Sequence, residues 1–93
     1  MEKSTHSPHY SAVREKLLEL RKQAGLTHRQ LAERLGREHS FVWRVEQGER
    51  RLDLVEFHWY CAALGCDGKA IYGLLAERFE EADRRNPGAT KKR

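Results

Sequence analysis

Apolar residues recur along this chain at helical spacing, in segments that each end at a glycine. Prolines stand only at positions 8 and 87, so residues 9–86 contain no proline to interrupt a helix. Glycine is typical of the position just past a helix end, and four of the glycines stand there. They are Gly25, Gly36, Gly48 and Gly65. The pattern predicts an all-α protein of five short helices.

Start signals place these helices along the chain. The first helix is expected to begin at Ser7-Pro8 or at Ser11 and to end at Gly25. Two later helices begin at a capping box, in which two side chains three residues apart bond to backbone N–H groups. The boxes are Thr27-His28-Arg29-Gln30 and Asp53-Leu54-Val55-Glu56. The four later helices are expected at residues 27–35, 39–47, 53–64 and 67–85. One domain at 11–85 follows, between a flexible tail at 1–10 and a basic tail at 86–93.

Residues 27–48 carry the pattern of a helix-turn-helix. Two short helices joined only by Gly36-Arg37-Glu38 must cross steeply, and the crossing needs a small side chain at the contact, here Ala32. Apolar residues on both helices would fix the angle. They are Leu31, Leu35, Val42 and Val45. Six positions with the expected residue types favour this motif over a plain helical hairpin, which is the alternative interpretation.

Residues 13–75 resemble the xenobiotic-response-element (XRE) family of bacterial and phage regulators, which includes lambda-type repressors and Cro proteins. The matching segments are LRKQAGLT at 20–27, LAERLG at 31–36, VEQG at 45–48 and ALG at 63–65. The resemblance implies a five-helix, lambda-repressor-like DNA-binding domain with an extended C-terminal helix. It also implies a homodimer whose third helix enters the major groove of double-stranded DNA. Finally, it implies a structural ion pair between Arg21 and Glu46.

The resemblance also selects candidate contacts to DNA. The base-reading candidates are Glu38, His39, Ser40, Trp43 and Arg44. With Val42 and Val45 inward, the outer face of the third helix carries most of these side chains. Arg44 is the strongest candidate because a guanidinium donates two hydrogen bonds to guanine O6 and N7. The phosphate candidates are His28, Arg29, Arg37, Gln47, Arg50 and Arg51.

The reading surface departs from the family pattern more than the scaffold does. Relatives commonly carry glutamine at the start of the second helix and of the third helix, where this chain has His28 and His39. Later in the third helix relatives commonly carry a small polar residue, where this chain has Trp43. Trp43 on this face either packs on DNA, which we favour from its position, or anchors a protein partner.

Charge is unevenly distributed over the 93 residues, whose formal net charge is +4. Residues 11–51 hold ten basic and six acidic side chains, whereas residues 52–85 hold four basic and seven acidic ones. The first three helices are therefore expected to contact DNA, helped by Lys91, Lys92 and Arg93, while the last two contact protein.

The expected dimer contacts are Trp59, Ile71, Tyr72, Leu75 and Phe79. The alternative is that the last helix only closes its own core.

Other chemistry finds little support in the sequence. The longest apolar run, residues 59–64, is far shorter than a membrane span. The polar N-terminus lacks an export signal. We therefore expect a cytoplasmic protein, located in the bacterial cytoplasm or nucleoid. His58, Cys61 and Cys66 lack a fourth ligand and the usual zinc spacing, so Cys61 is expected in the core. We expect no metal, no cofactor and no enzymatic activity, because the histidines fit no catalytic motif.

These observations predict a sequence-specific transcriptional regulator that binds double-stranded DNA. We expect a repressor that occupies a palindromic operator as a homodimer. An antitoxin-like or other protein-binding module on the same scaffold, with secondary DNA binding, is the alternative function.

Overall fold

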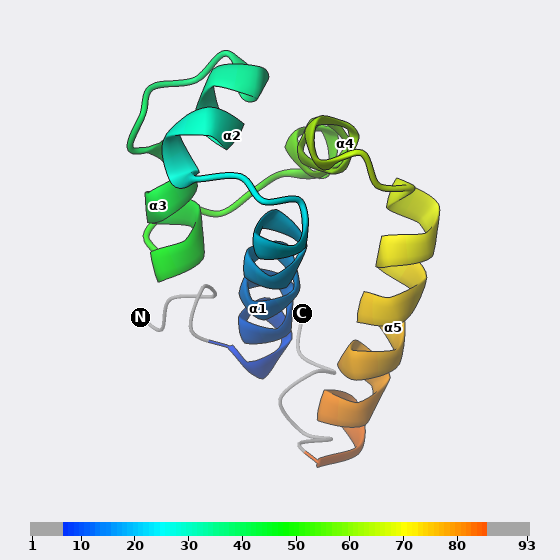
Figure 1. Ribbon diagram of the computed structural model, residues 1–93. Coiled ribbons are helices and arrows are strands. Elements are labelled where there is room, and N and C mark those ends of the chain that lie inside the picture. Colours follow the sequence, from blue (N-terminus) through cyan, green and yellow to red (C-terminus); the bar gives the residue numbers. More distant parts are fainter. Residues whose placement is uncertain (1–6, 86–93) are drawn as a thin grey trace.

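The computed structural model describes residues 7–85, and this part of the chain is all-α, as predicted (Figure 1). Its five helices are α1 (Pro8–Gln23), α2 (His28–Leu35), α3 (Phe41–Gln47), α4 (Leu54–Leu64) and α5 (Gly68–Arg85). Both predicted capping boxes are present, at Thr27 with Gln30 and at Asp53 with Glu56. The expected basic tail at 86–93 and residues 1–6 of the expected flexible tail at 1–10 lie outside the described residues.

Helix α1 begins at the earlier of its two predicted starts. The Ser7 hydroxyl accepts a hydrogen bond from the Tyr10 N–H, and Pro8 occupies the first turn. Tyr10 is buried. The predicted domain start at residue 11 is therefore too late, because Tyr10 belongs to the folded domain.

Helix α3 begins at Phe41, two residues after the predicted start at His39. The Phe41 N–H bonds to the Glu38 carbonyl, three residues back, at 3.0 Å, so a tight turn precedes the helix. The Ser40 side chain makes no capping hydrogen bond. His39 and Ser40 therefore lie in the turn, and the side chain of Phe41, for which we made no prediction, is buried.

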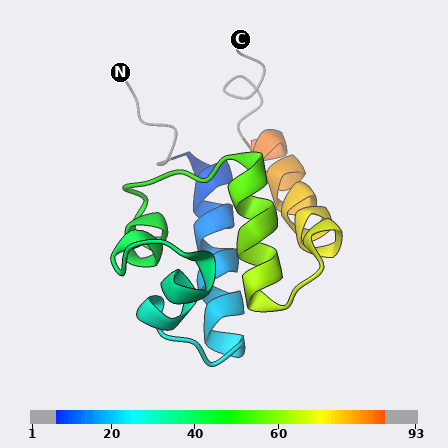
Figure 2. The ribbon, with the colours of Figure 1, turned by 90° about the horizontal axis from the view of Figure 1, so that it is seen from above.

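Helices α1 and α4 lie side by side at the centre, with α2 and α3 on one side and α5 on the other (Figure 2). Every helix contributes to one hydrophobic core. Its most buried members, one from each helix in chain order, are Leu17, Leu31, Val45, Tyr60 and Leu75. Ala32 and Val42 are also fully buried, as expected of the helix-turn-helix crossing. The motif is thus held from behind by α1 and α4.

Helix α5 packs against α1 and α4 and closes the core of its own chain. Ile71 and Leu75 are only 8% and 2% exposed, so the prediction that they contact a second subunit is wrong. They lie four residues apart, on the helix face that packs into the core. Two contacts fasten the same helix to α1, His9 Nε2 to Asp83 and Arg78 to Glu15, both at 2.7 Å.

Candidate nucleic-acid interface

The five predicted base-reading residues form one exposed turn and helix face at 38–44. Trp43 is 44% exposed, while the neighbouring Val42 is fully buried in the core. Arg44 Nη2 donates to Glu38 Oε2 at 2.8 Å and lies 3.5 Å from the Ser40 hydroxyl. The turn before α3 and the helix itself therefore present an arginine, a carboxylate and an indole together.

A buried ion pair fixes α3 to α1. Arg21 and Glu46 are each 8% exposed, and two hydrogen bonds join them, from Nε to Oε2 at 2.7 Å and from Nη2 to Oε1 at 3.1 Å. Arg21 Nη1 also donates to the Leu26 carbonyl at 2.9 Å. Arg14 adds a bond from Nε to the Glu46 carbonyl at 3.0 Å. The pair implied by the family resemblance is thus present, and it sets the orientation of the exposed face.

His28 reaches this ion pair as well. Its Nε2 lies 2.8 Å from Glu46 Oε1, so the Glu46 carboxylate contacts side chains from α1 and from the start of α2. The His28 side chain is 37% exposed. The sequence suggested a phosphate contact for His28 but gave no signal for this contact, because residues 28 and 46 are joined only by the tertiary fold.

Two predicted phosphate contacts, Arg37 and Arg50, converge on Phe41 and Glu56. Their guanidinium carbons lie 4.0 and 5.2 Å from the centre of the Phe41 ring. Arg50 Nη2 donates to Glu56 Oε2 at 2.6 Å, and Arg37 Nη1 lies 3.4 Å from the same oxygen. Arg50 is the main cause that lowers the pKa of Glu56 to about 2, followed by the Asp53 N–H. Glu56 thus joins the loop after α3 to the start of α4.

The sequence interpretation missed both partners in this cluster. Phe41 lies four residues before Val45, a spacing that places both on one helix face, so the apolar pattern contained a signal for its burial. Glu56 was recognised only as the second residue of a capping box. Its side chain does accept from the Asp53 N–H at 2.9 Å, but the arginine contacts depend on the path of the preceding loop.

The remaining phosphate candidates lie at both ends of the motif. Arg29 and Gln47 are exposed, and Arg29 Nε lies 3.7 Å from Glu33 Oε2. The Arg51 guanidinium carbon lies 5.2 Å from the centre of the Tyr10 ring. The Tyr10 hydroxyl in turn accepts from the Leu52 N–H at 3.1 Å, so the loop after α3 is tied to the start of α1.

The cysteines, possible metal ligands and helix hydropathy within residues 7–85 also bear on the sequence predictions. Cys61 is buried in the core, as predicted. No three histidine, cysteine or acidic side chains in this range are arranged to hold a metal ion. None of the described helices is both long and apolar enough to cross a membrane.

Known proteins share this architecture. A family model described as a helix-turn-helix domain matches residues 12–71. The solved structure of an XRE-family like protein from Pseudomonas syringae pv. tomato str. DC3000 is 45% identical, with a TM-score of 0.70 over 74% of this chain and 86% of that chain. No curated protein matches. The motif, its anchoring and these matches together show that the chain belongs to the XRE-type helix-turn-helix family of DNA-binding regulators.

Proposed function

We propose that this regulator is a repressor that reads a palindromic operator as a homodimer. The observation that carries the proposal is the exposed α3 face, held on the scaffold by the buried Arg21–Glu46 pair. A rigidly held helix presents its side chains to base edges at a defined angle. Repression follows where the operator overlaps a promoter, because the bound protein then excludes the polymerase.

Arg44 and its neighbours supply the chemistry for reading bases. The Arg44 guanidinium suits O6 and N7 of guanine, and Glu38, 2.8 Å away, either orients it or accepts from N4 of a nearby cytosine. The Trp43 indole offers an apolar surface to a thymine methyl group. We therefore expect an operator half-site that contains a G·C pair opposite Arg44.

Exposed aromatic side chains support the homodimer. Trp59 on α4 and Tyr72 on α5 are 57% and 54% exposed. Phe79 is partly buried against the core and packs edge-on against Tyr72, with ring centres 6.3 Å apart. Helix α5 lies on the opposite side of α1 from α2 and α3 (Figure 2). A symmetric contact through these three residues would leave both α3 faces exposed. Half-sites about 34 Å apart, one turn of DNA, would then be read together.

Sequencing of oligonucleotides selected by the purified protein tests the proposal. We expect enrichment of a palindrome, and Arg44→Ala should weaken operator binding by about 1–3 kcal/mol, the value of a good bidentate base contact. Arg84→Ala is the matched control, because it removes an equal charge from the exposed end of α5. If no sequence is enriched, the proposal fails and a protein-binding module is favoured. A monomer at all concentrations in sedimentation would refute the dimer.

A further inference from the structure

Arg14, a residue of α1 for which we predicted no role, contacts the end of α3. Its Nε donates to the Glu46 carbonyl at 3.0 Å. The same guanidinium lies against Gly48, which ends α3 in the left-handed region of backbone conformation. A Cβ on Gly48 would lie 3.3 Å from Arg14 Nε and 3.4 Å from Arg14 Cζ, so a side chain there would displace the guanidinium. Gly48 therefore leaves the space that Arg14 occupies.

The Arg14 guanidinium is partly buried and has no carboxylate partner within residues 7–85. Arg21 on the same helix, in contrast, pairs with the Glu46 carboxylate. The exposed Glu49 makes no ion pair with Arg14. A guanidinium has five N–H donors, and the Glu46 carbonyl accepts only the one on Nε, so the Nη1 and Nη2 groups find no acceptor in this part of the chain. A partly buried charge without a counterion favours an anionic ligand.

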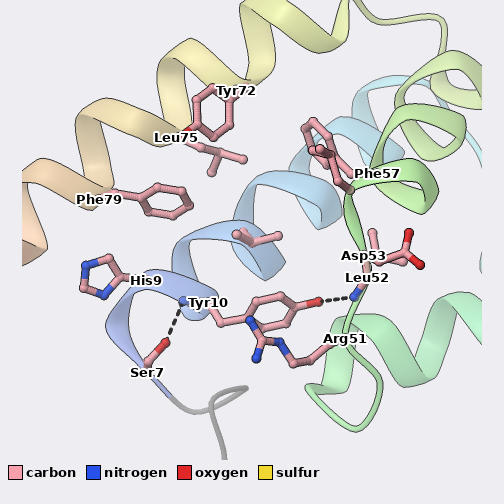
Figure 3. Close-up of a pocket in the computed structure, with 12 residues that line it drawn as sticks. Ser7, His9, Tyr10, Arg51, Leu52, Asp53, Phe57, Tyr72, Leu75 and Phe79 are labelled. Carbon is pink, nitrogen blue, oxygen red and sulfur yellow. Dashed lines mark hydrogen bonds between the residues drawn. The ribbon is translucent and has the colours of Figure 1, made fainter. Parts of the chain in front are cut away.

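Positive charge gathers near Arg14 from the loop after α3. Arg50 and Arg51 lie in this loop, and Figure 3 shows Arg51 beside the Tyr10 ring. Burial raises the pKa of Tyr10, and the hydrogen bond from the Leu52 N–H opposes this shift. The charges of Arg51, Arg14 and Arg50 oppose it as well, so all three guanidinium groups lie near one phenol. Helix α1 thus contributes a cation to the same positive region as the loop.

We propose that Arg14 holds a phosphate of the DNA backbone at the end of α3. Its two Nη nitrogens donate to two phosphate oxygens, a geometry that the planar guanidinium matches. Because the Glu46 carbonyl already holds Nε, the side chain loses little conformational freedom when DNA binds. Gln47, exposed in the last turn of α3, is an expected phosphate contact beside this position. The contact extends the proposed interface to α1.

This assignment rests on the proposed function only in that α3 faces the DNA duplex. It requires neither a palindrome nor a dimer, because phosphate contacts carry no sequence information. A phosphate contact strengthens binding to the operator and to random duplex alike. A residue that only orients α3 would strengthen binding to the operator alone, because base contacts depend on the angle of that helix. The two roles of Arg14 therefore predict different results.

Fluorescence anisotropy of the full chain with operator and with random duplex of equal length, over about 50–200 mM salt, separates these roles. Arg14→Gln keeps an N–H donor for the Glu46 carbonyl but removes the charge. We expect a loss of affinity of about tenfold on both duplexes, and a logarithmic salt slope that is shallower by about 0.9. Arg14→Lys retains the charge and should keep the wild-type slope. Arg84→Gln is the matched control, because it removes an equal charge from the exposed end of α5 and should change neither quantity.

An unchanged slope for Arg14→Gln, or an equally shallow slope for Arg14→Lys, would overturn the phosphate contact. Weaker binding to the operator with random duplex unaffected would show instead that Arg14 only orients α3. Circular dichroism checks that each variant is folded, and Arg14→Met, which keeps an apolar stem without the charge, replaces Arg14→Gln if that variant unfolds. If selection enriches no palindrome while random duplex gives the expected change of slope, the repressor proposal fails and the Arg14 contact stands.

Discussion

Removal of the Glu46 carboxylate tests how the α3 face is held. Glu46→Ala removes the carboxylate that accepts two hydrogen bonds from Arg21 and contacts His28. The Arg21 guanidinium then stays buried and keeps its hydrogen bond to the Leu26 carbonyl. An unpaired buried charge costs about 3–5 kcal/mol. For a domain of this size, a loss of about 3 kcal/mol lowers the melting temperature by about 12–24 °C. Operator affinity should fall as well, because α3 loses its fixed orientation.

Chemical denaturation followed by circular dichroism measures the change in unfolding free energy. Glu80→Ala is the matched control, because Glu80 is an exposed glutamate on α5, and its loss should change stability by less than about 0.5 kcal/mol. The double variant Arg21→Met/Glu46→Ala removes both charges. It should be less destabilised than the sum of the single variants, by about 1–3 kcal/mol.

A small effect would refute this reasoning. If Glu46→Ala costs less than about 1 kcal/mol, or if the two single effects simply add, the pair does not lock α3 to α1. Loss of operator affinity at full stability would instead mean that Glu46 contacts DNA directly.

Three further substitutions test separate parts of the structure. Trp43→Ala should weaken operator binding in a mobility-shift assay at unchanged melting temperature, whereas unchanged affinity would assign Trp43 to a protein partner. The pKa of Glu56 is about 2 in the folded protein against an ordinary 4.5, so its stabilising contact is complete above pH 4.5 and lost as the pH falls toward 2. Urea unfolding across this range should show a shallower acid loss for Glu56→Gln, and an identical profile would contradict the Arg50–Glu56 assignment. Gly48→Ala should lower the free energy of unfolding by about 1–2 kcal/mol in the same assay, because Gly48 has φ +82° and a Cβ there would lie 3.3 Å from Arg14 Nε. An unchanged free energy of unfolding would contradict that strain.

The elements of this fold were predictable because their signals are local. The capping boxes at Thr27 and Asp53 each lie within four consecutive residues, and apolar spacing marks the buried face of α2. The start of α3 was misplaced because it depends on a turn at Glu38 and on the tertiary burial of Phe41. Neither is encoded in a cap.

Contacts between distant segments were predicted less well. Helix α5 was expected at the right place, but its apolar residues could not be divided between core and surface before α1 was placed beside it. Ile71 and Leu75 therefore seemed available to a partner. The exposed positions of α3 were predicted from helical geometry alone, whereas the carboxylates beside Arg44 and Arg50 were not, because each contact depends on a particular turn or loop.

Arg44 and Arg50 each pair with a carboxylate, Glu38 and Glu56, which would act as a built-in counterion on the face that we propose to contact DNA. Affinity for DNA falls with salt by a logarithmic slope of about −0.9 for each phosphate that is neutralised. Because Glu38 and Glu56 remain close to their arginines, we expect fewer ions to be released than the arginines alone suggest, and a shallower slope. Binding to random sequences consists mainly of phosphate contacts and is weakened most. At the proposed phosphate contact Arg50, the Glu56 carboxylate is thereby expected to reduce total affinity and to increase the preference for an operator over bulk genomic DNA.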